Sequence, residues 1–161
     1  MERYHLRMTE RAIRGRKKQL DLLETRIHMT LAMCNGDDPY LVEVNHAFDR
    51  SAMRLYFHCA PEGKKLDYLR SNPRVWGQVL EDDGYVEGRC DYSYRSVMFG
   101  GIASPVTSLS EKKHALTLMI DKMDADPAAM KKRLLNPERL KTVTVYRIEI
   151  SEISGKQSVR K

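Results

Sequence analysis

The sequence lacks long apolar runs, and this absence bears on where the protein can reside. No stretch of its 161 residues approaches the roughly 18 apolar residues that a membrane-spanning helix needs. Residues 1–18 are rich in charge and contain nothing like the apolar segment of a signal peptide. We therefore expect a cytoplasmic protein with no membrane partner.

Cysteine is also scarce: the chain has three, at positions 34, 59 and 90, with no CxxC spacing. An odd number of isolated cysteines does not build a disulfide framework or a zinc ribbon. Three histidines, His28, His46 and His58, fall on different expected strands, and their spacing does not favour a metal site. The sequence therefore predicts a chain suited to a reducing compartment, with no bound metal.

Negative charge is the minority sign. The chain has 28 Lys and Arg residues against 22 Asp and Glu residues, which gives a formal net charge of +6. Much of the positive excess lies in residues 11–18 and 131–141. A basic surface can hold nucleic acid, but neither stretch is interleaved with aromatic residues that could stack on bases. We interpret both stretches as solvated faces, and a phosphate-bearing small molecule would need only a few of these charges.

The length and the 42% share of hydrophobic residues are typical of one globular domain. No internal repeat is visible, and no linker rich in Gly, Ser or Pro divides the chain. We therefore expect a single domain over residues 1–161.

Apolar periodicity predicts a helix and three strands in the first part of the chain. An amphipathic pattern of helical period covers residues 10–24. From residue 27 to 33 the period changes to two, which indicates a strand that ends in the turn 35–39. Further strands are expected over 40–48 and 53–59, and we interpret the three strands as a β-meander.

The rest of the chain alternates between strands and helices. Proline-bounded residues 61–72 predict a short helix, and the polar residues 81–91, with two glycines, predict a loop. A capping box of Ser108 and Glu111 predicts the start of a longer helix. Two Xaa-Pro pairs in 126–137 break up a short helical stretch. Strands are expected over 74–80, 92–104 and 142–153.

This order of elements favours a barrel. The expected connections contain few βαβ units, which a parallel sheet would require. About six short antiparallel strands with about three inserted helices argue for a small barrel rather than a doubly wound sheet. The predicted fold class is mainly β with inserted helices, and such a barrel closes its own edges while leaving grooves at its surface.

The segment 56–67 holds the most informative chemistry, because a strand ends and a helix begins within it. The free amide groups of a helix's first turn favour an anion, and Gly63 permits a close approach. Lys64 and Lys65 add positive charge at the same place. A phosphate would fit there, although surface lysines that bind nothing are also common.

Several reactive side chains allow more than one interpretation. His58 alternates with Phe57, so one of the two points into the barrel and the other outward. His58 suits a structural hydrogen bond as well as catalysis, and Cys59 suits a small hydrophobe as well as a nucleophile. Ser96 could give a hydroxyl to a ligand or simply belong to a core strand. No Ser/His/Asp triad can be assembled.

Four groups of motifs occur in a fixed order along the chain. They are Tyr56-Phe57-His58-Cys59-Ala60 with Glu62-Gly63 and Lys65-Leu66-Asp67, then Tyr94-Arg95-Ser96-Val97, then Val145-Tyr146-Arg147-Ile148, and last Ile153-Ser154-Gly155-Lys156. In order and spacing this set resembles the FMN-binding split-barrel proteins. The resemblance is to the pyridoxamine 5′-phosphate oxidase-related group, which includes the nitroimidazole-resistance (5-nitroimidazole reductase-like) proteins.

The resemblance implies a fold, an assembly and a site. The fold would be a six-stranded antiparallel split β-barrel that forms a homodimer, with two FMN molecules in the grooves between the subunits. Segment 42–45 would run along the isoalloxazine ring. The residues that the resemblance or the local pattern places near the flavin or its phosphate are Val42, Glu43, Val44, Asn45, His58, Cys59, Ala60, Gly63, Lys64, Lys65 and Ser96. Among them, His58 is the candidate catalytic residue.

Two residues depart from the family pattern. Glu43 stands where many members have proline or an apolar residue, and His46 stands where an aromatic residue is usual. Both departures bear on substrate preference more than on the fold.

The resulting hypothesis is an FMN-dependent oxidoreductase that acts on a small electron-accepting or amine substrate. The flavin would perform the electron chemistry, while the protein would supply position and electrostatics. NADH or NADPH could be the electron donor, although no GxGxxG fingerprint is present. Two alternatives stay open: a flavin carrier or sensor without turnover, and a nucleic-acid-binding barrel, which the lack of serial stacking aromatics disfavours.

Overall fold

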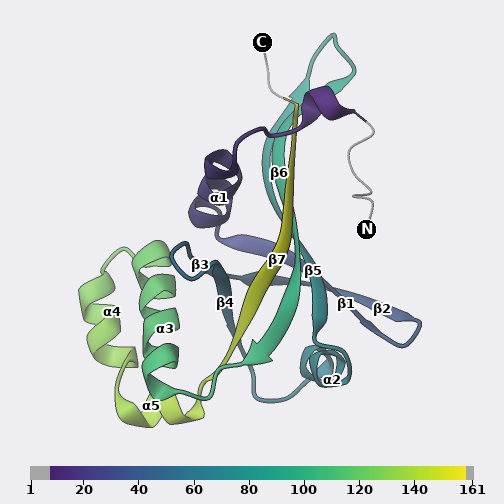
Figure 1. Ribbon diagram of the computed structural model, residues 1–161. Helices are drawn as coiled ribbons and strands as arrows, with labels where there is room; N and C mark the ends of the chain where they lie inside the picture. Colours follow the sequence, from purple (N-terminus) through teal and green to yellow (C-terminus); the bar gives the residue numbers. More distant parts are fainter. Residues whose placement is uncertain (1–7, 159–161) are drawn as a thin grey trace.

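Residues 8–158, which the computed structural model describes, form one seven-stranded antiparallel sheet with five α-helices packed around it (Figure 1). The strands are β1 (His28–Asn35), β2 (Asp38–Asn45), β3 (Ala47–Asp49), β4 (Arg54–Cys59), β5 (Arg74–Val86), β6 (Asp91–Pro105) and β7 (Thr144–Ser158). The helices are α1 (Arg16–Thr25), α2 (Lys64–Ser71), α3 (Leu109–Met123), α4 (Pro127–Leu134) and α5 (Pro137–Thr142). Residues 1–7 and 159–161 of the expected single domain lie outside the described residues.

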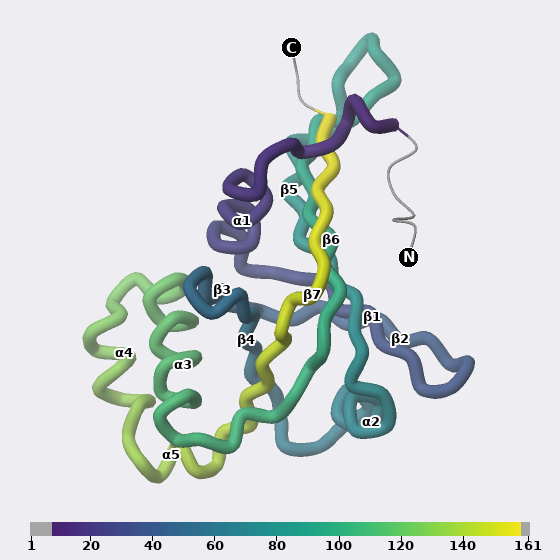
Figure 2. Tube along the Cα trace, viewed as in Figure 1, coloured from purple at the N-terminus to yellow at the C-terminus, as the bar shows by residue number. Residues whose placement is uncertain are grey.

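The sheet curls because of how its edges are connected. Its strand order is β2-β1-β5-β6-β7-β4-β3, so β2 and β3 are the two edge strands. These strands are consecutive in the chain, with only His46 between them. Edge strands joined by one residue must lie close together, so the sheet bends until its two ends meet (Figure 2). The expected fold class, a mainly-β split barrel with inserted helices, is confirmed.

The strand expected over 40–48 is in fact two strands. At His46 the chain leaves its partner β1 and continues as β3 beside β4. The amide of His46 donates to the carbonyl oxygen of Ile27 at 2.8 Å, where the chain crosses from one edge to the other. The sheet therefore has seven strands instead of six, and the expected meander is wrong, because β2 and β4 pair with different neighbours.

The loop expected over 81–91 is mostly strand. β5 and β6 form a long hairpin that projects beyond the barrel (Figure 1). Tyr85 and Tyr92 pair across the hairpin, with their ring centroids 5.6 Å apart. Gly84, at a φ of 87°, lies where the register shifts between Asp82 and Tyr85. The polar residues and glycines of this segment therefore mark a bulge and a tight turn in an exposed hairpin.

The helices follow the expected caps, with some shifted ends. Ser108 caps α3 by accepting from the amide of Glu111 at 3.4 Å, as expected. Pro127 and Pro137 begin α4 and α5 instead of interrupting a helix, because proline fits the first helical turn. These two helices bring the number in residues 8–158 to five. No helix in that range is long and apolar enough to span a membrane.

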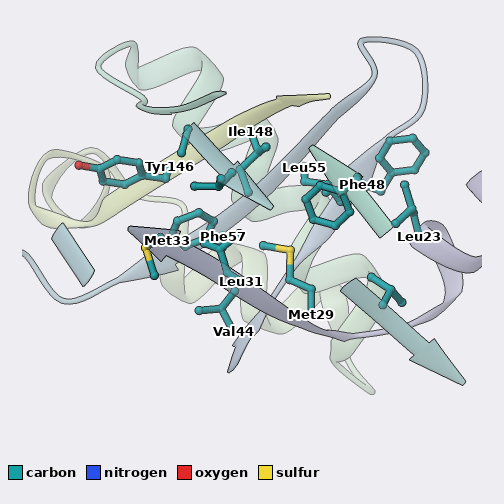
Figure 3. Packing of buried hydrophobic residues seen from close by; sticks show 14 of the residues in the cluster. Leu23, Met29, Leu31, Met33, Val44, Phe48, Leu55, Phe57, Tyr146 and Ile148 are labelled. Atoms are coloured by element: carbon teal, nitrogen blue, oxygen red, sulfur yellow. The ribbon is translucent and has the colours of Figure 1, made fainter. Parts of the chain in front are cut away.

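The barrel interior is filled by residues that alternate along the strands. Figure 3 shows Leu31, Phe57 and Ile148 pointing toward one another from β1, β4 and β7. Glycine is required at one point of this packing: a Cβ on Gly77 of β5 would collide with the ring of Phe99 on β6. The core of the barrel therefore depends on a small residue beside a large one across neighbouring strands.

A buried polar cluster holds α1 and α3 to the corner of the barrel. The His46 side chain is fully buried, and its Nε2 donates to the carbonyl oxygen of Leu23 at 2.9 Å. Lys122 of α3 donates to the carbonyl oxygens of Leu23 at 3.3 Å, His46 at 3.2 Å, and Arg26. Burial and the neighbouring Lys122 ammonium lower the pKa of His46 to about 4. The imidazole is therefore neutral at physiological pH.

We predict that the free energy of unfolding falls as the pH falls from about 6.5 to about 4. The lowered pKa of His46 means that the unfolded chain takes up this proton at a higher pH than the folded chain does. The contribution is roughly 3 kcal/mol, fully present above the unfolded pKa of 6.5 and lost below the folded pKa of about 4.

Urea unfolding at a series of pH values measures this dependence. His46→Gln keeps an N–H donor toward Leu23 but cannot titrate, so the slope of stability against pH between about 6.5 and 4 should become shallower in the variant. Equal slopes in the two proteins would contradict the assignment.

Candidate functional site

β4 presents its side chains alternately to the barrel interior and to the outside. Phe57 is fully buried and stacks on Tyr146 of β7, with ring centroids 5.6 Å apart (Figure 3). His58 is exposed and lies on the opposite side of the strand. The expectation that one of these two residues points inward and the other outward is confirmed. Cys59, half-buried, ends the strand.

The chain passes from β4 to α2 through an exposed segment that includes Ala60 and Gly63. Helix α2 begins at Lys64, three residues later than Pro61, which was expected in its first turn. Gly63 is the N-cap, with a φ of 130°, a conformation that favours glycine. Gly63 has no side chain to cap the helix, and its carbonyl oxygen accepts from the amides of Leu66 at 2.8 Å and Asp67 at 3.3 Å. Within residues 8–158, the amides of Lys64 and Lys65 have no hydrogen-bond partner, so these two amides form a local positive end at the start of α2.

The two lysines at the start of α2 point in different directions. The Lys64 ammonium lies 4.9 Å from the ring centroid of Tyr40 and 5.3 Å from that of Tyr68. The Lys65 ammonium lies 5.6 Å from the ring centroid of Phe57, on the side of β4. Lys65 therefore belongs with the β4 residues, whereas Lys64 belongs to an aromatic pair that bridges α2 and β2.

Lys65 acts electrostatically on the residues at the end of β4. Partial desolvation and the Lys65 ammonium lower the pKa of His58. Burial raises the pKa of the Cys59 thiol, although Lys65 acts in the opposite direction. At neutral pH the imidazole is thus uncharged and the thiol is protonated, so Cys59 is a poor nucleophile. Cys34, Cys59 and Cys90 are all free.

The segment 42–45 divides between the two sides of the sheet. Val42 and Val44 face the barrel interior, whereas Glu43 and Asn45 are exposed. The Glu43 carboxylate accepts a hydrogen bond from the hydroxyl of Thr30 at 2.8 Å. Of the four expected residues, only Glu43 and Asn45 therefore have side chains that a ligand outside the barrel could contact. For His46, the other departure from the family pattern, the expected bearing on substrate preference more than on the fold is wrong, because its side chain is fully buried in the corner described above.

Ser96 lies on β6, apart from the end of β4. Its hydroxyl donates to the carbonyl oxygen of Lys156 at 3.5 Å. It lines a pocket of about 260 Å³ whose other walls come from β5, β6 and β7. His58, in contrast, lines a larger apolar pocket beneath α3, α4 and α5. Within one chain, the expected residues therefore form separate groups.

Glu43 and Ser96 share one exposed side of the sheet with a set of apolar residues. Residues paired across antiparallel strands lie on the same side, and the pairs Glu43–Thr30, Thr30–Gln78 and Leu80–Ser96 connect β2 with β6. We call this side the outer sheet face. Its exposed apolar side chains, 40–65% accessible, are Leu41, Trp76, Leu80, Met98 and Ile102.

The apolar residues of the outer sheet face were not predicted as site residues. The sequence of β5 could have indicated this face, because apolar residues occur on both sides of the strand. Val75 and Val79 are buried, yet Trp76 and Leu80 on the opposite side are also apolar. A strand that is apolar on both sides is expected to be covered on both sides.

The sequence predicted no bound metal, because its histidines fall on different strands. Within residues 8–158, no group of three or more His, Cys, Asp or Glu side chains could hold a metal ion. His46 is enclosed by backbone carbonyls and Lys122, and His58 faces the helices α3 to α5. The histidines singled out from the sequence therefore serve different parts of the structure.

Comparison with known proteins places most of the chain in one family. Residues 15–157 match the model of the protein family described as pyridoxamine 5′-phosphate oxidase. An uncharacterized protein of Rhizobium meliloti is 45% identical to this chain over 51 residues. That match covers 32% of each protein, so the chain spans about a third of the length of this curated relative.

Solved structures share the fold over most of the chain. The flavocytochrome Anf3 from Azotobacter vinelandii has a TM-score of 0.82 at 18% identity, covering 99% of this chain and 75% of that one. A candidate 5-nitroimidazole antibiotic resistance protein from Bacteroides thetaiotaomicron has a TM-score of 0.71 at 23% identity, covering 90% and 85%. An FAD-binding protein from Mesorhizobium loti has a TM-score of 0.65 at 25% identity, covering 89% and 95%. The first two similarities bear on the fold alone.

Replacing Lys65 by glutamine should raise the pKa of His58, because the Lys65 ammonium is one of the two causes that lower it. The rise should be partial, since desolvation of the imidazole remains. Titration of the His58 ring signal by NMR measures the change. Lys64→Gln is the matched control and should leave this pKa unchanged, because the Lys64 ammonium lies over Tyr40 and Tyr68. Equal pKa values in the parent and Lys65→Gln would contradict the proximity of Lys65 to His58.

Proposed function

Because the chain belongs to the pyridoxamine 5′-phosphate oxidase family, we propose that it binds FMN and acts as a flavin-dependent oxidoreductase. The observation that carries the proposal is the arrangement at the end of β4, where the Lys65 ammonium acts on an uncharged His58 and Lys65 itself belongs to the first turn of α2. The name of one structural neighbour, an FAD-binding protein that is 25% identical to this chain, supports a flavin. Bound FMN would supply the electron and hydride transfer.

The residues at the start of α2 fit the phosphate of FMN. Helix amides without an intrahelical acceptor favour a phosphate dianion. A Cβ built on Gly63 would meet nothing within 4 Å, so the approach to these amides is open. Within residues 8–158, Lys65 makes no ion pair with a carboxylate, and its ammonium is available as a counter-charge.

His58 would contribute a neutral imidazole to this site. Because its pKa is lowered, the ring at neutral pH has one N–H donor and one nitrogen acceptor. It could therefore orient a polar edge of the flavin or hold a proton next to the substrate. This role makes His58 the proposed catalytic residue, while Cys59 with its raised pKa would be a packing residue.

We further propose that a second copy of the chain covers the outer sheet face and that the flavin ring lies between the two subunits. Monomeric proteins rarely leave a contiguous apolar patch of this kind exposed. Leu41, Trp76 and Leu80 come from neighbouring strands and would be buried by an isologous contact. Glu43 and Ser96 lie on the same side and would border the ring at this interface.

The substrate would be a small electron acceptor or an amine, with NADH or NADPH as the electron donor. Fold does not determine the reaction in this family, so turnover needs a direct test. A flavin carrier or sensor without turnover is the alternative that shares the same site.

The purified chain should be yellow or become so on titration with FMN. Fluorescence titrations with FMN and FAD compare the two flavins, and the proposal expects tighter binding of FMN because its phosphate ends at the α2 amides. Anaerobic addition of NADH or NADPH, followed by an electron acceptor, then measures turnover. Flavin that binds but is neither reduced nor reoxidised would make the protein a carrier or sensor, and failure to bind any flavin would refute the proposal.

Lys65→Ala should weaken FMN binding by roughly 10- to 150-fold, because losing a charge-assisted contact to phosphate costs about 1.5–3 kcal/mol. Lys64→Ala is the matched control: it removes the same charge one residue away, where the ammonium lies over Tyr40 and Tyr68. Fluorescence titration with FMN gives both Kd values. If Lys64→Ala lost as much affinity as Lys65→Ala, general positive charge would explain the binding.

Light scattering should give the parent protein a mass of two chains, each 18.7 kDa. Trp76→Glu should shift the protein toward monomer, because it places a charge at the centre of the outer sheet face. Leu109→Glu, which changes an equally exposed apolar residue at the start of α3, should leave the dimer intact. A parent that is monomeric with flavin bound would overturn the proposed interface.

A further inference from the structure

A separate pocket of about 480 Å³ lies beneath the three helices α3, α4 and α5. In Figure 1 these helices form a group at one side of the barrel, beside β4 and away from α2. The volume is in the range of pockets that hold small molecules. The apolar side chains that line it are Leu116, Met119, Ile120, Met123, Met130, Leu134 and Val143.

The helices around this pocket are suited to adapting to an occupant. Helix α4 has no buried residue, so its apolar residues Met130 and Leu134 face the pocket without being enclosed by the protein. Three of the lining residues are methionines, whose flexible side chains adjust to ligands of different shape. An apolar molecule in the pocket would therefore complete the packing of α4 against α3.

The polar residues that line the pocket are a carboxylate, Asp124, a guanidinium, Arg139, and two uncharged groups, Thr142 and His58. The Asp124 carboxylate already accepts from the amide of Asp126 at 2.9 Å. Arg139 lines the pocket from α5, and within residues 8–158 its guanidinium has no ion pair or hydrogen-bond partner. Lys131, by contrast, is paired with Asp121. Arg139 is thus a cation without a counter-charge at the wall of an apolar pocket.

We propose that this pocket binds a small apolar carboxylate, with its hydrocarbon body among the α3 and α4 side chains and its carboxylate at Arg139. A guanidinium binds a carboxylate in a planar, bidentate geometry, and Arg139 is exposed, so its guanidinium is accessible to a carboxylate. His58 lies at the β4 side of the same pocket. The occupant would thus reach the residue that we propose to contact the flavin, but its binding does not require flavin.

The test uses isothermal titration calorimetry of the full chain with 2-naphthoate, a flat apolar anion, and with its neutral analogue 2-naphthamide. We expect naphthoate to bind about tenfold more tightly than the amide, the effect of one charge-assisted contact. Arg139→Gln should remove this preference and leave the amide unaffected. Lys132→Gln is the matched control, because it removes a positive charge on α4 that does not line the pocket.

Two further variants test the location of the site. Met123→Trp and Leu134→Trp should each fill the pocket from a different helix and weaken binding of both compounds by about tenfold or more. Leu109→Glu, which changes an exposed apolar residue of α3 that does not line the pocket, should leave naphthoate binding unchanged. Circular dichroism establishes that each variant is folded. The proposal requires that at least one of the two filling variants is folded and binds both compounds weakly.

The outcomes separate this proposal from the proposed function. Failure of naphthoate to bind the parent, equal affinity in Arg139→Gln, or equal affinity in both filling variants would overturn the pocket assignment. Loss of binding in Leu109→Glu would do the same, because the compound would then bind at an exposed apolar residue outside the pocket. FMN titration of the same samples reports on flavin binding independently, so a protein without flavin affinity can still confirm or refute this site.

Discussion

The single residue between the two edge strands is the constraint from which the rest of the architecture follows. β2 and β3 lie at opposite edges of the sheet order, yet only His46 separates them in the chain. The sheet must therefore curl, and the curl creates an enclosed core on one side and an outer face on the other. The cluster of His46, Leu23 and Lys122 fixes this crossing to α1 and α3, so the helices are positioned by the same turn that closes the barrel.

The curl also explains why neighbouring residues of one motif have different roles. Phe57 belongs to the core, where it stacks on Tyr146, whereas His58 faces the helices on the other side of the strand. Lys64 and Lys65 diverge in the same way, because consecutive helical residues point about 100° apart. The residues of segment 56–67 are therefore divided among the core, an aromatic pair and the candidate site. Substitutions within this one segment should for that reason have different effects.

Much of the fold could be predicted from the sequence, because β1, β4 and α3 carry clear periodicity and caps. The resemblance to the pyridoxamine 5′-phosphate oxidase family is likewise confirmed. The partition of residues 38–49 could not be predicted, since alternation continues through His46 while the pairing partner changes from β1 to β4. Only the end of the hairpin of β5 and β6, residues 81–91, was mistaken for a loop, because most of its residues are polar where the hairpin projects into solvent.

The candidate site was accessible to sequence reasoning only where the chemistry is local. The change from strand to helix at residues 59–64 identified the α2 amides and the lysines, since all of them lie within one segment. Sequence spacing could not show that Lys64 turns toward Tyr40, or that Arg139 lacks a counter-charge, because both depend on contacts between distant elements. The outer sheet face could not be predicted for the same reason, because its residues come together only through the pairing of four strands.

Two glycines of β6, Gly100 and Gly101, follow the motif Tyr94-Arg95-Ser96-Val97, and their surroundings give them a structural role. A Cβ on Gly101 would collide with the carbonyl of Glu149, and one on Gly100 would crowd the Glu152 side chain. At this point the register of β6 and β7 shifts, and beyond it β7 continues along β6 without its other partner β4. The two glycines are therefore required where the barrel splits, by the chain's own strands. Ser96 precedes the two glycines on the same strand, so the path of the sheet can account for its place in the motif without a contact to a cofactor.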